Sequence, residues 1–233
     1  MNECMGRPLI PSGRLVHRMR LGFCIGCLLL VLSGCARSTV SISFEGLCGL
    51  THEEFATMDE ATLIPWVEEH YGVTPSKMGE RVEAGVVVPI YTWLKGKTRG
   101  SAMLHDGSLV KIWLEDVQNG PTFGQVVETL GPPKTLYRSA TGWEGTMYTL
   151  GLEYPELGFS VKKHDWLWGY VNQVTLSEDI QVNAISCYAP GSLEEIMQEI
   201  NMAHPEVITD ALRFYYPPWP GFGASVTLER GLP

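Results

Sequence analysis

The side chains that could carry out chemistry in this 233-residue chain are its histidines, carboxylates and cysteines. Two His-Asp pairs, His105-Asp106 and His164-Asp165, lie where turns are expected, and together they could bind a zinc ion. No histidine falls into the HExxH or Cys–His spacings that are typical of metal sites. We therefore expect no metal site and interpret both pairs as solvated turn residues.

Paired carboxylates occur at Glu53-Glu54, Glu68-Glu69 and Glu194-Glu195, all within segments that favour helices. Adjacent residues on a helix diverge by about a third of a turn, so none of these pairs forms an acid/base dyad alone. The chain has no GxSxG elbow, no P-loop and no dinucleotide fingerprint. The sequence therefore predicts no catalytic residue and no cofactor, and an envelope hydrolase is the third-ranked hypothesis.

Cys35 follows a basic segment and an apolar run near the start of the chain. Arg14, Arg18 and Arg20 precede an apolar run over 21–32, which is too short to span a bilayer core of ~30 Å as a stable helix. The run closes on Leu32-Ser33-Gly34-Cys35. This arrangement resembles the signal peptide and lipobox of bacterial lipoproteins, the type that is cleaved by signal peptidase II.

The lipoprotein resemblance implies that residues 1–34 are a signal peptide and that Cys35 carries a covalent lipid with palmitate-like chains. The folded region would then lie on the extracytoplasmic face of a membrane, in the cell envelope. The alternatives are an uncleaved signal anchor and a secretory signal with a chance cysteine. Met1 and Met19 both remain candidate start residues, and inner and outer membranes both remain open.

Loss of the signal peptide changes the cysteine count. Of the six cysteines, three leave with residues 1–34 and Cys35 is lipidated, which leaves Cys48 and Cys187. An even pair in an exported chain favours a disulfide, and two separately buried thiols are the alternative.

The charge also changes. Four of the 17 basic residues and one of the 26 acidic residues lie in 1–34, so 13 basic and 25 acidic residues remain, a net charge of −12. Such a surface argues against nucleic-acid binding, and we expect attachment to the membrane through acyl chains alone. Residues 35–44 form a tether that spans at most ~30 Å.

Beyond the tether, the pattern predicts two α+β modules, over 45–117 and 118–233. The first contains a helix signal at Thr51 and a second at Asp59 or Thr62. Strands are expected at 86–94, 100–104 and 108–115, with a hairpin turn at Asp106-Gly107. The second contains a helix that ends at Gly131, four strands, and a helix over 192–201. Its strands are expected at 146–154, 157–163, 171–177 and 181–188.

The two modules are expected to be related in tandem. TLIPWVEEHYGVTP at 62–75 matches TFGQVVETLGPP at 122–133, and each segment precedes a predicted sheet. Chance similarity between two amphipathic helices is the alternative.

The second module carries a family resemblance. Its pattern of helix, Leu-Gly-x-Pro and aromatic strand falls on Thr122, Val126, Leu130, Gly131, Pro133, Trp143 and Tyr148. It resembles small lipoprotein domains of the SmpA/OmlA (BamE) type and the related fold of the β-lactamase inhibitory protein. The resemblance implies a non-enzymatic protein that binds or scaffolds an envelope protein partner. The chain departs from it by having about twice one domain's length and a long aromatic tail.

That tail is the candidate binding surface. Tyr215, Tyr216, Trp219 and Phe222 are interleaved with prolines and glycine, which favour an extended segment. Aromatic side chains displayed in this way can anchor a protein or stack on sugar rings, so a carbohydrate or cell-wall binding module is the second hypothesis. Packing of these rings onto the hydrophobic core is the alternative. We expect no small-molecule ligand.

Overall fold

The structure, a computed structural model, describes residues 41–83, 86–142, 145–201 and 205–230. The predicted signal peptide and the lipidated Cys35 lie outside the described residues, so both stay predictions. The described residues group as one compact unit. Among the described residues, no helix has both the length and the apolar character that are needed to span a bilayer.

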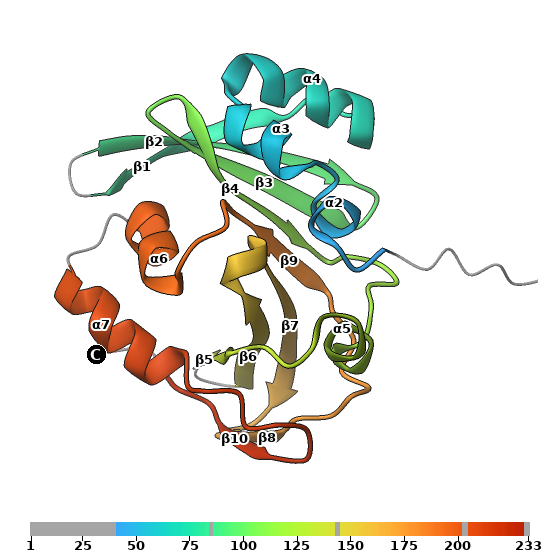
Figure 1. Ribbon diagram of the computed structural model, residues 1–233, viewed down its shortest axis with the longest axis vertical. Helices are drawn as coiled ribbons and strands as arrows, with labels where there is room; N and C mark the ends of the chain where they lie inside the picture. Colours follow the sequence, from blue (N-terminus) through green and yellow to red (C-terminus); the bar gives the residue numbers. More distant parts are fainter. Residues whose placement is uncertain (1–40, 84–85, 143–144, 202–204, 231–233) are drawn as a thin grey trace, which may run out of the picture. The chain divides into compact units, whose positions relative to one another are not determined.

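An eight-stranded antiparallel sheet forms the centre of this unit (Figure 1). Its spatial order is β1-β2-β3-β4-β9-β7-β6-β5, and a two-stranded sheet pairs β10 with β8. The strands are β1 Ser76–Glu83, β2 Val86–Lys95, β3 Thr98–His105, β4 Ser108–Glu115, β5 Thr135–Thr141, β6 Gly145–Tyr154, β7 Phe159–Trp168, β8 Gln173–Thr175, β9 Ala184–Cys187 and β10 Ser225–Thr227.

Helices cover both faces of the sheet. They are α2 Phe44–Cys48, α3 His52–Thr57, α4 Glu60–Tyr71, α5 Phe123–Leu130, α6 Leu193–Asn201 and α7 Pro205–Tyr215, with the 3-10 turn η1 at Pro155–Leu157. In Figure 1, α6 and α7 lie on the other side of the sheet from α2, α3 and α5. The predicted mixed α+β class is confirmed.

The two predicted modules contribute to one continuous sheet. Strands β1 to β4 come from 45–117, and β5, β6, β7 and β9 come from 118–233. The halves join where β4 pairs with β9, from Ile112 opposite Cys187 to Glu115 opposite Ala184. A helix precedes each set of four strands, which run from an outer edge of the sheet to its centre.

Local sequence signals explain where several elements begin and end. Thr122 caps α5 in a capping box with Gln125, and the helix ends at Gly131 as predicted. The β3–β4 hairpin turns at Asp106 and Gly107, which both have positive φ angles of 51° and 81°. A turn of this kind favours Asp-Gly, because glycine adopts positive φ without a steric penalty.

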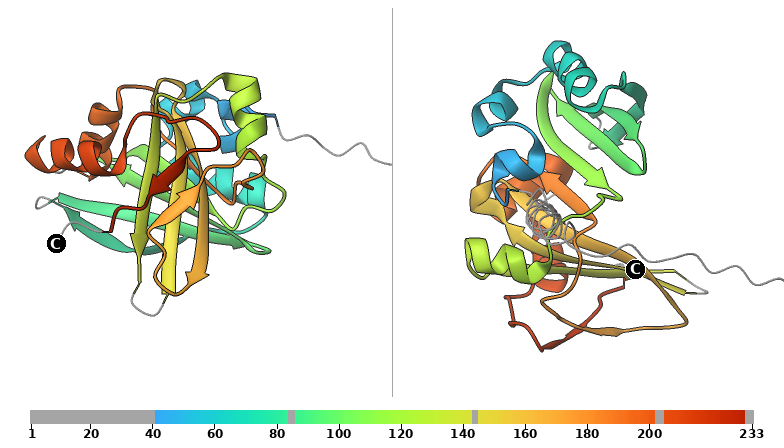
Figure 2. Two further views of the ribbon diagram at one scale, coloured as in Figure 1. Left: turned by 90° about the horizontal axis from the view of Figure 1, so that it is seen from below. Right: turned by 90° about the vertical axis from the view of Figure 1, so that its right-hand side faces the viewer.

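The main core lies on the face that α2 to α5 cover. Alternate strand residues point into it, among them Trp93, Ile112, Leu152 and Val161. Strands β8 and β10, which lie beside the β5–β7 part of the sheet in both views of Figure 2, add Val226 to the same core. The other face presents the intervening residues of the strands. In β2, β3 and β4 these include a small second hydrophobic cluster of Val88, Met103 and Val110, whereas in β6 and β7 they include Glu153 and Lys162, and we call this side of the sheet the polar face.

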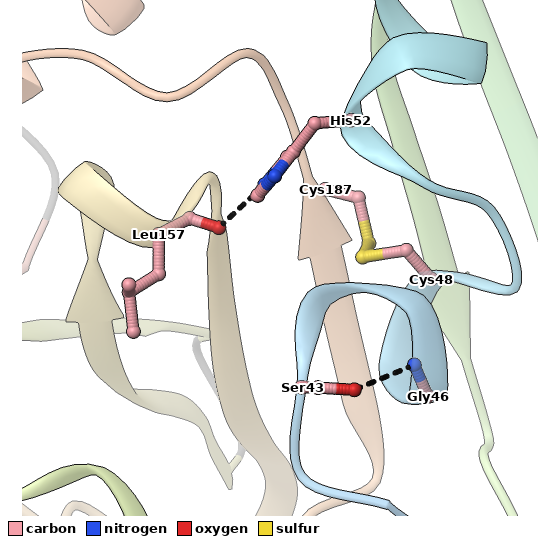
Figure 3. The surroundings of a disulfide bond; sticks show 6 residues. All are labelled: Ser43, Gly46, Cys48, His52, Leu157 and Cys187. Atoms are coloured by element: carbon pink, nitrogen blue, oxygen red, sulfur yellow. Dashed lines mark hydrogen bonds between the residues drawn. A yellow bond between two sulfur atoms is a disulfide. The ribbon is translucent and has the colours of Figure 1, made fainter.

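The predicted disulfide is confirmed. Cys48 at the end of α2 bonds to Cys187 of the central strand β9, and both cysteines are fully buried in the main core (Figure 3). Next to it, His52 Nε2 lies 3.2 Å from the carbonyl oxygen of Leu157. The bridge joins the first helix of the described chain to the middle of the sheet, across 139 positions of sequence.

Four elements lack a counterpart in the sequence prediction: α2, β1, β5 and α7. Helix α7 includes the first residues of the aromatic tail, because it continues to Tyr215. An extended segment follows only from Tyr216 onward, and it leads into β10 at Ser225–Thr227.

Candidate functional site

The polar face of the sheet carries a cavity of about 400 Å³. Alternation along β6 and β7 creates it, since Leu152 and Val161 point to the main core while Glu153 and Lys162 point the other way. Helix α6 borders the cavity with Leu193, Ile196 and Met197. The cavity therefore lies between a helix and the strands on both sides of the β4–β9 junction.

The floor of the cavity holds a buried ion pair. Glu153 is only 3% exposed, and its Oε1 lies 3.8 Å from Lys162 Nζ. Tyr188 donates a hydrogen bond of 3.3 Å to Oε2 of the same carboxylate. Within the part of the chain that the structure describes, Oε1 has no hydrogen-bond partner. A buried carboxylate oxygen in this state retains its capacity to accept a hydrogen bond.

Gly151 allows this floor to form. A Cβ atom at this position would lie between 3.1 and 3.2 Å from Lys162 Cγ, Glu153 Oε1 and Tyr137 Cβ. Because glycine has no side chain, the lysine, the carboxylate and the tyrosine converge above it. The ammonium of Lys162 also lies 5.1 Å from the ring centroid of Tyr137, within the range of a cation–π interaction.

Two tyrosines keep their protons in this environment. Burial raises the pKa of the Tyr188 hydroxyl well above its usual range, and the Glu153 carboxylate raises it further. Burial and Glu153 have the same effect on the pKa of Tyr216, whose ring lies 5.0 Å from that of Tyr137. Both hydroxyls are therefore hydrogen-bond donors at neutral pH.

His164 borders the cavity from β7 and was expected in a turn. Its Nδ1 shares a hydrogen bond of 2.8 Å with Thr149 Oγ1, and its backbone exchanges two hydrogen bonds with the Asn183 side chain. Burial lowers the pKa of His164, and the nearby charges of Lys162 and Lys163 lower it further, whereas Asp116 raises it. The surroundings of His164 therefore favour the uncharged imidazole.

The two His-Asp pairs of the sequence have separate surroundings. Asp165 points away from the cavity and pairs with Lys163 at 3.2 Å, whereas His105 Nε2 lies 3.7 Å from Asp106 in the β3–β4 hairpin. Only His164 of these residues borders the cavity. Among the described residues, no cluster of three or more His, Cys, Asp or Glu side chains could hold a metal ion.

An exposed aromatic patch adjoins this face at the open end of the β6–β7 pair, where β6 begins and β7 ends. We define the patch as Met147, Trp166, Trp168 and Tyr170, all large apolar residues with high exposure. Trp168 is 87% exposed and Trp166 is 47% exposed. Met147 pairs with Trp166 across the two strands, and Trp166 follows His164 on the same face of β7.

The rings of the patch have defined neighbours. A Cβ atom at Gly145 would lie 2.3 Å from the indole of Trp166, so the glycine lets that ring lie across β6. The guanidinium of Arg230 lies 3.9 Å from the ring centroid of Tyr170. These contacts position two rings of the patch and leave much of their surface exposed.

The predicted binding surface is divided between two places. Tyr215 and Tyr216 pack on Tyr137, with ring centroids 6.3 and 5.0 Å away, and Tyr216 also borders the cavity. Trp219 and Phe222 form an edge-to-face pair at 5.2 Å and pack against the main core. All four are half-buried, so these contacts match the packing alternative, and a binding role for them stays a prediction.

Sequence reasoning missed Glu153 and Lys162. The available signal was a charged residue directly next to core residues in each strand, Glu153 in GLEY and Lys162 in SVKK. Their pairing depends on the register of β6 and β7, which places Gly151 opposite Lys162.

Comparison with known proteins gives no further guide to these sites. A scan against protein-family models, a search of curated proteins and a search of solved structures each found no match. The side chains of the cavity and of the aromatic patch therefore carry the evidence on function.

Proposed function

We propose that the protein is an exported lipoprotein, anchored through Cys35, whose folded region binds another protein of the cell envelope without catalysing a reaction. The signal and lipobox pattern of residues 14–35 supports export and anchoring. The Cys48–Cys187 disulfide supports the same location, since such bridges persist mainly in oxidising compartments.

The aromatic patch is the observation that carries the binding part of this proposal. Contiguous exposed apolar patches often mark interaction sites, and tryptophan is enriched among the residues that dominate binding energy at protein interfaces. Trp166 and Trp168 lie on a paired strand, so little conformational entropy is lost when a partner covers them. Loss of such an anchor typically costs about 2 kcal/mol or more of binding free energy.

We also propose that the two halves of the sheet are related modules. The matching order of a helix followed by four strands, together with the similarity of residues 62–75 and 122–133, supports this relation. The test is whether the backbone of 62–115 superposes on that of 122–187, which includes β9, with elements in the same chain order. A match that requires a permuted order would contradict a tandem relation.

Partner binding is tested by crosslinking in cells that produce the full chain. We expect one envelope protein to be recovered in stoichiometric amount, and the double variant Trp166→Ala/Trp168→Ala to lose it. Leu94→Ala is the matched control, because Leu94 is an exposed apolar residue on β2, outside the patch. Equal recovery with the double variant would refute the role of the patch.

Anchoring has a separate test. Metabolic labelling with a palmitate analogue should label the wild-type chain, and Cys35→Ser should abolish the label and release the protein from membranes. A labelled Cys35→Ser variant would contradict the anchor.

A further inference from the structure

The cavity on the polar face lies apart from the residues of the proposed partner-binding patch, and its composition points to a ligand. Its 400 Å³ falls within the range of about 300–1,000 Å³ that is usual for small-molecule sites. Like such sites, it combines aromatic walls with a small number of convergent polar groups. These polar groups include Glu153 Oε1, which is buried and lacks a hydrogen-bond partner among the described residues.

The charges of the cavity balance. Its lining contains two lysines, Lys111 and Lys162, and two glutamates, Glu115 and Glu153. Each has an interaction of its own: Lys162 with Glu153, Glu115 with Arg99 at 3.9 Å, and Lys111 with the Trp113 ring at 5.5 Å. A charged ligand would have to compete with these pairs, so the lining favours a neutral ligand.

The hydrogen-bonding groups are arranged as an adjacent acceptor and donor. Glu153 Oε1 can only accept, and Lys162 Nζ, 3.8 Å away, can only donate. A vicinal diol matches this arrangement, because each hydroxyl both donates and accepts and the two oxygens are neighbours. Such hydrogen bonds to charged groups are the stronger ones in proteins.

The walls of the cavity supply the apolar surface that the ligand would contact. Tyr137 and Tyr216 lie 5.0 Å apart at one side, and Trp113 borders the other half of the sheet. Aromatic rings in this position present flat apolar faces beside polar tips. The molecule that offers both vicinal hydroxyls and an apolar C–H face is a sugar ring.

We propose that this cavity is a binding site for a neutral sugar ring, with two adjacent hydroxyls on Glu153 and Lys162 and one face on Tyr137 and Tyr216. Of the predicted carbohydrate surface, only Tyr216 borders this cavity, whereas Trp219 and Phe222 pack against the main core. The site is independent of the proposed partner binding, because none of the patch residues borders the cavity.

The test is a titration of the full-length chain, purified in a detergent that has no sugar headgroup. The probes are glucose, galactose, mannose, N-acetylglucosamine and N-acetylgalactosamine, with glycine and glutamate as charged comparisons. We expect at least one sugar to bind saturably below about 20 mM by NMR chemical-shift change. Absence of binding by all five sugars, or binding of an amino acid in their place, would overturn the proposal.

Two substitutions assign the binding to the cavity. Glu153→Gln should weaken it about tenfold or more, because a hydrogen bond to a charged acceptor is lost. Glu156→Gln is the matched control, since Glu156 lies on η1, is exposed and does not border the cavity. Equal affinity in the two variants would overturn the assignment.

A second variant covers the case in which Glu153→Gln does not fold. Tyr137→Leu removes a half-buried ring of edge strand β5 and leaves the buried ion pair in place. It should weaken sugar binding while the far-ultraviolet circular dichroism spectrum stays that of the wild type. Unchanged affinity in this variant would overturn the proposal. Loss of partner crosslinking with intact sugar binding, or the reverse, separates this site from the aromatic patch.

Discussion

Removal of the Cys48–Cys187 bridge is expected to be the most damaging small change to the described fold. The two cysteines are 139 positions apart, so the bridge closes a very long loop in the unfolded chain. In the chain-entropy model, closure of a loop of this length stabilises the folded state by about 5 kcal/mol. The free energy of unfolding of the double variant Cys48→Ala/Cys187→Ala should therefore be lower than that of the wild type by this amount.

A loss of this size is a large fraction of the total free energy of unfolding. Domains typically have a free energy of unfolding of about 5–15 kcal/mol, and a chain of this size loses about 2–4 °C of Tm for each kcal/mol. The variant should therefore melt about 10–20 °C below the wild type. The measurement is urea titration together with thermal unfolding, both followed by circular dichroism, with and without reductant.

The design contains its own control. Reductant should destabilise the wild type to the level of the double variant and should leave the double variant unchanged. Because both sulfurs are fully buried, reductant should act on the wild type only when the chain opens. A difference in unfolding free energy below about 1 kcal/mol would refute the loop-closure argument, and two reactive thiols in the native protein would refute the bridge.

Three further perturbations test local features. Gly100→Ala should cost about 1–3 kcal/mol of stability by urea titration, because the new Cβ would lie 2.1 Å from the Trp93 indole. Folding lowers the pKa of His164, so its contribution to stability is present above about pH 6.5 and is lost as the pH falls through the folded-state pKa. His164→Gln should therefore flatten the fall in Tm between about pH 7 and pH 5. Thr122→Ala should cost about 1 kcal/mol, since it removes the capping box with Gln125.

Matched variants distinguish these effects from general damage. Gly191→Ala should cost little, since the nearest atom to its added Cβ is 3.4 Å away, at the end of a flexible side chain. Thr129→Ala, in the same helix as the capping box, should retain the stability that Thr122→Ala loses. A steep pH profile in His164→Gln would contradict the assignment to the imidazole.

The elements with local signals were predictable from the sequence. Helix α5 has a threonine cap at its start and Gly131 after its last residue, and β4 begins directly after an Asp-Gly turn. Edge strands β1 and β5 were missed, because a strand with one neighbour need not alternate apolar and polar residues. Met78, for example, is an apolar residue of β1 that is 73% exposed.

The cavity could not be predicted in the same way. It depends on strand register, on the join between β4 and β9, and on the position of α6 over the polar face. The disulfide was predictable because the lipobox interpretation left two cysteines, whereas Glu153 and Lys162 carry no motif that marks their pairing.

The bridge between α2 and β9 also determines how the protein bears mechanical load. When tension is applied along the chain from residue 41 to residue 230, it passes from Cys48 directly to Cys187 through a covalent bond. The segment between the two cysteines then carries no load, and about 470 Å of contour length stays hidden while the bridge is intact. Most of the sheet is thereby shielded from stretching, and only reduction of the bridge would release that length to an applied force.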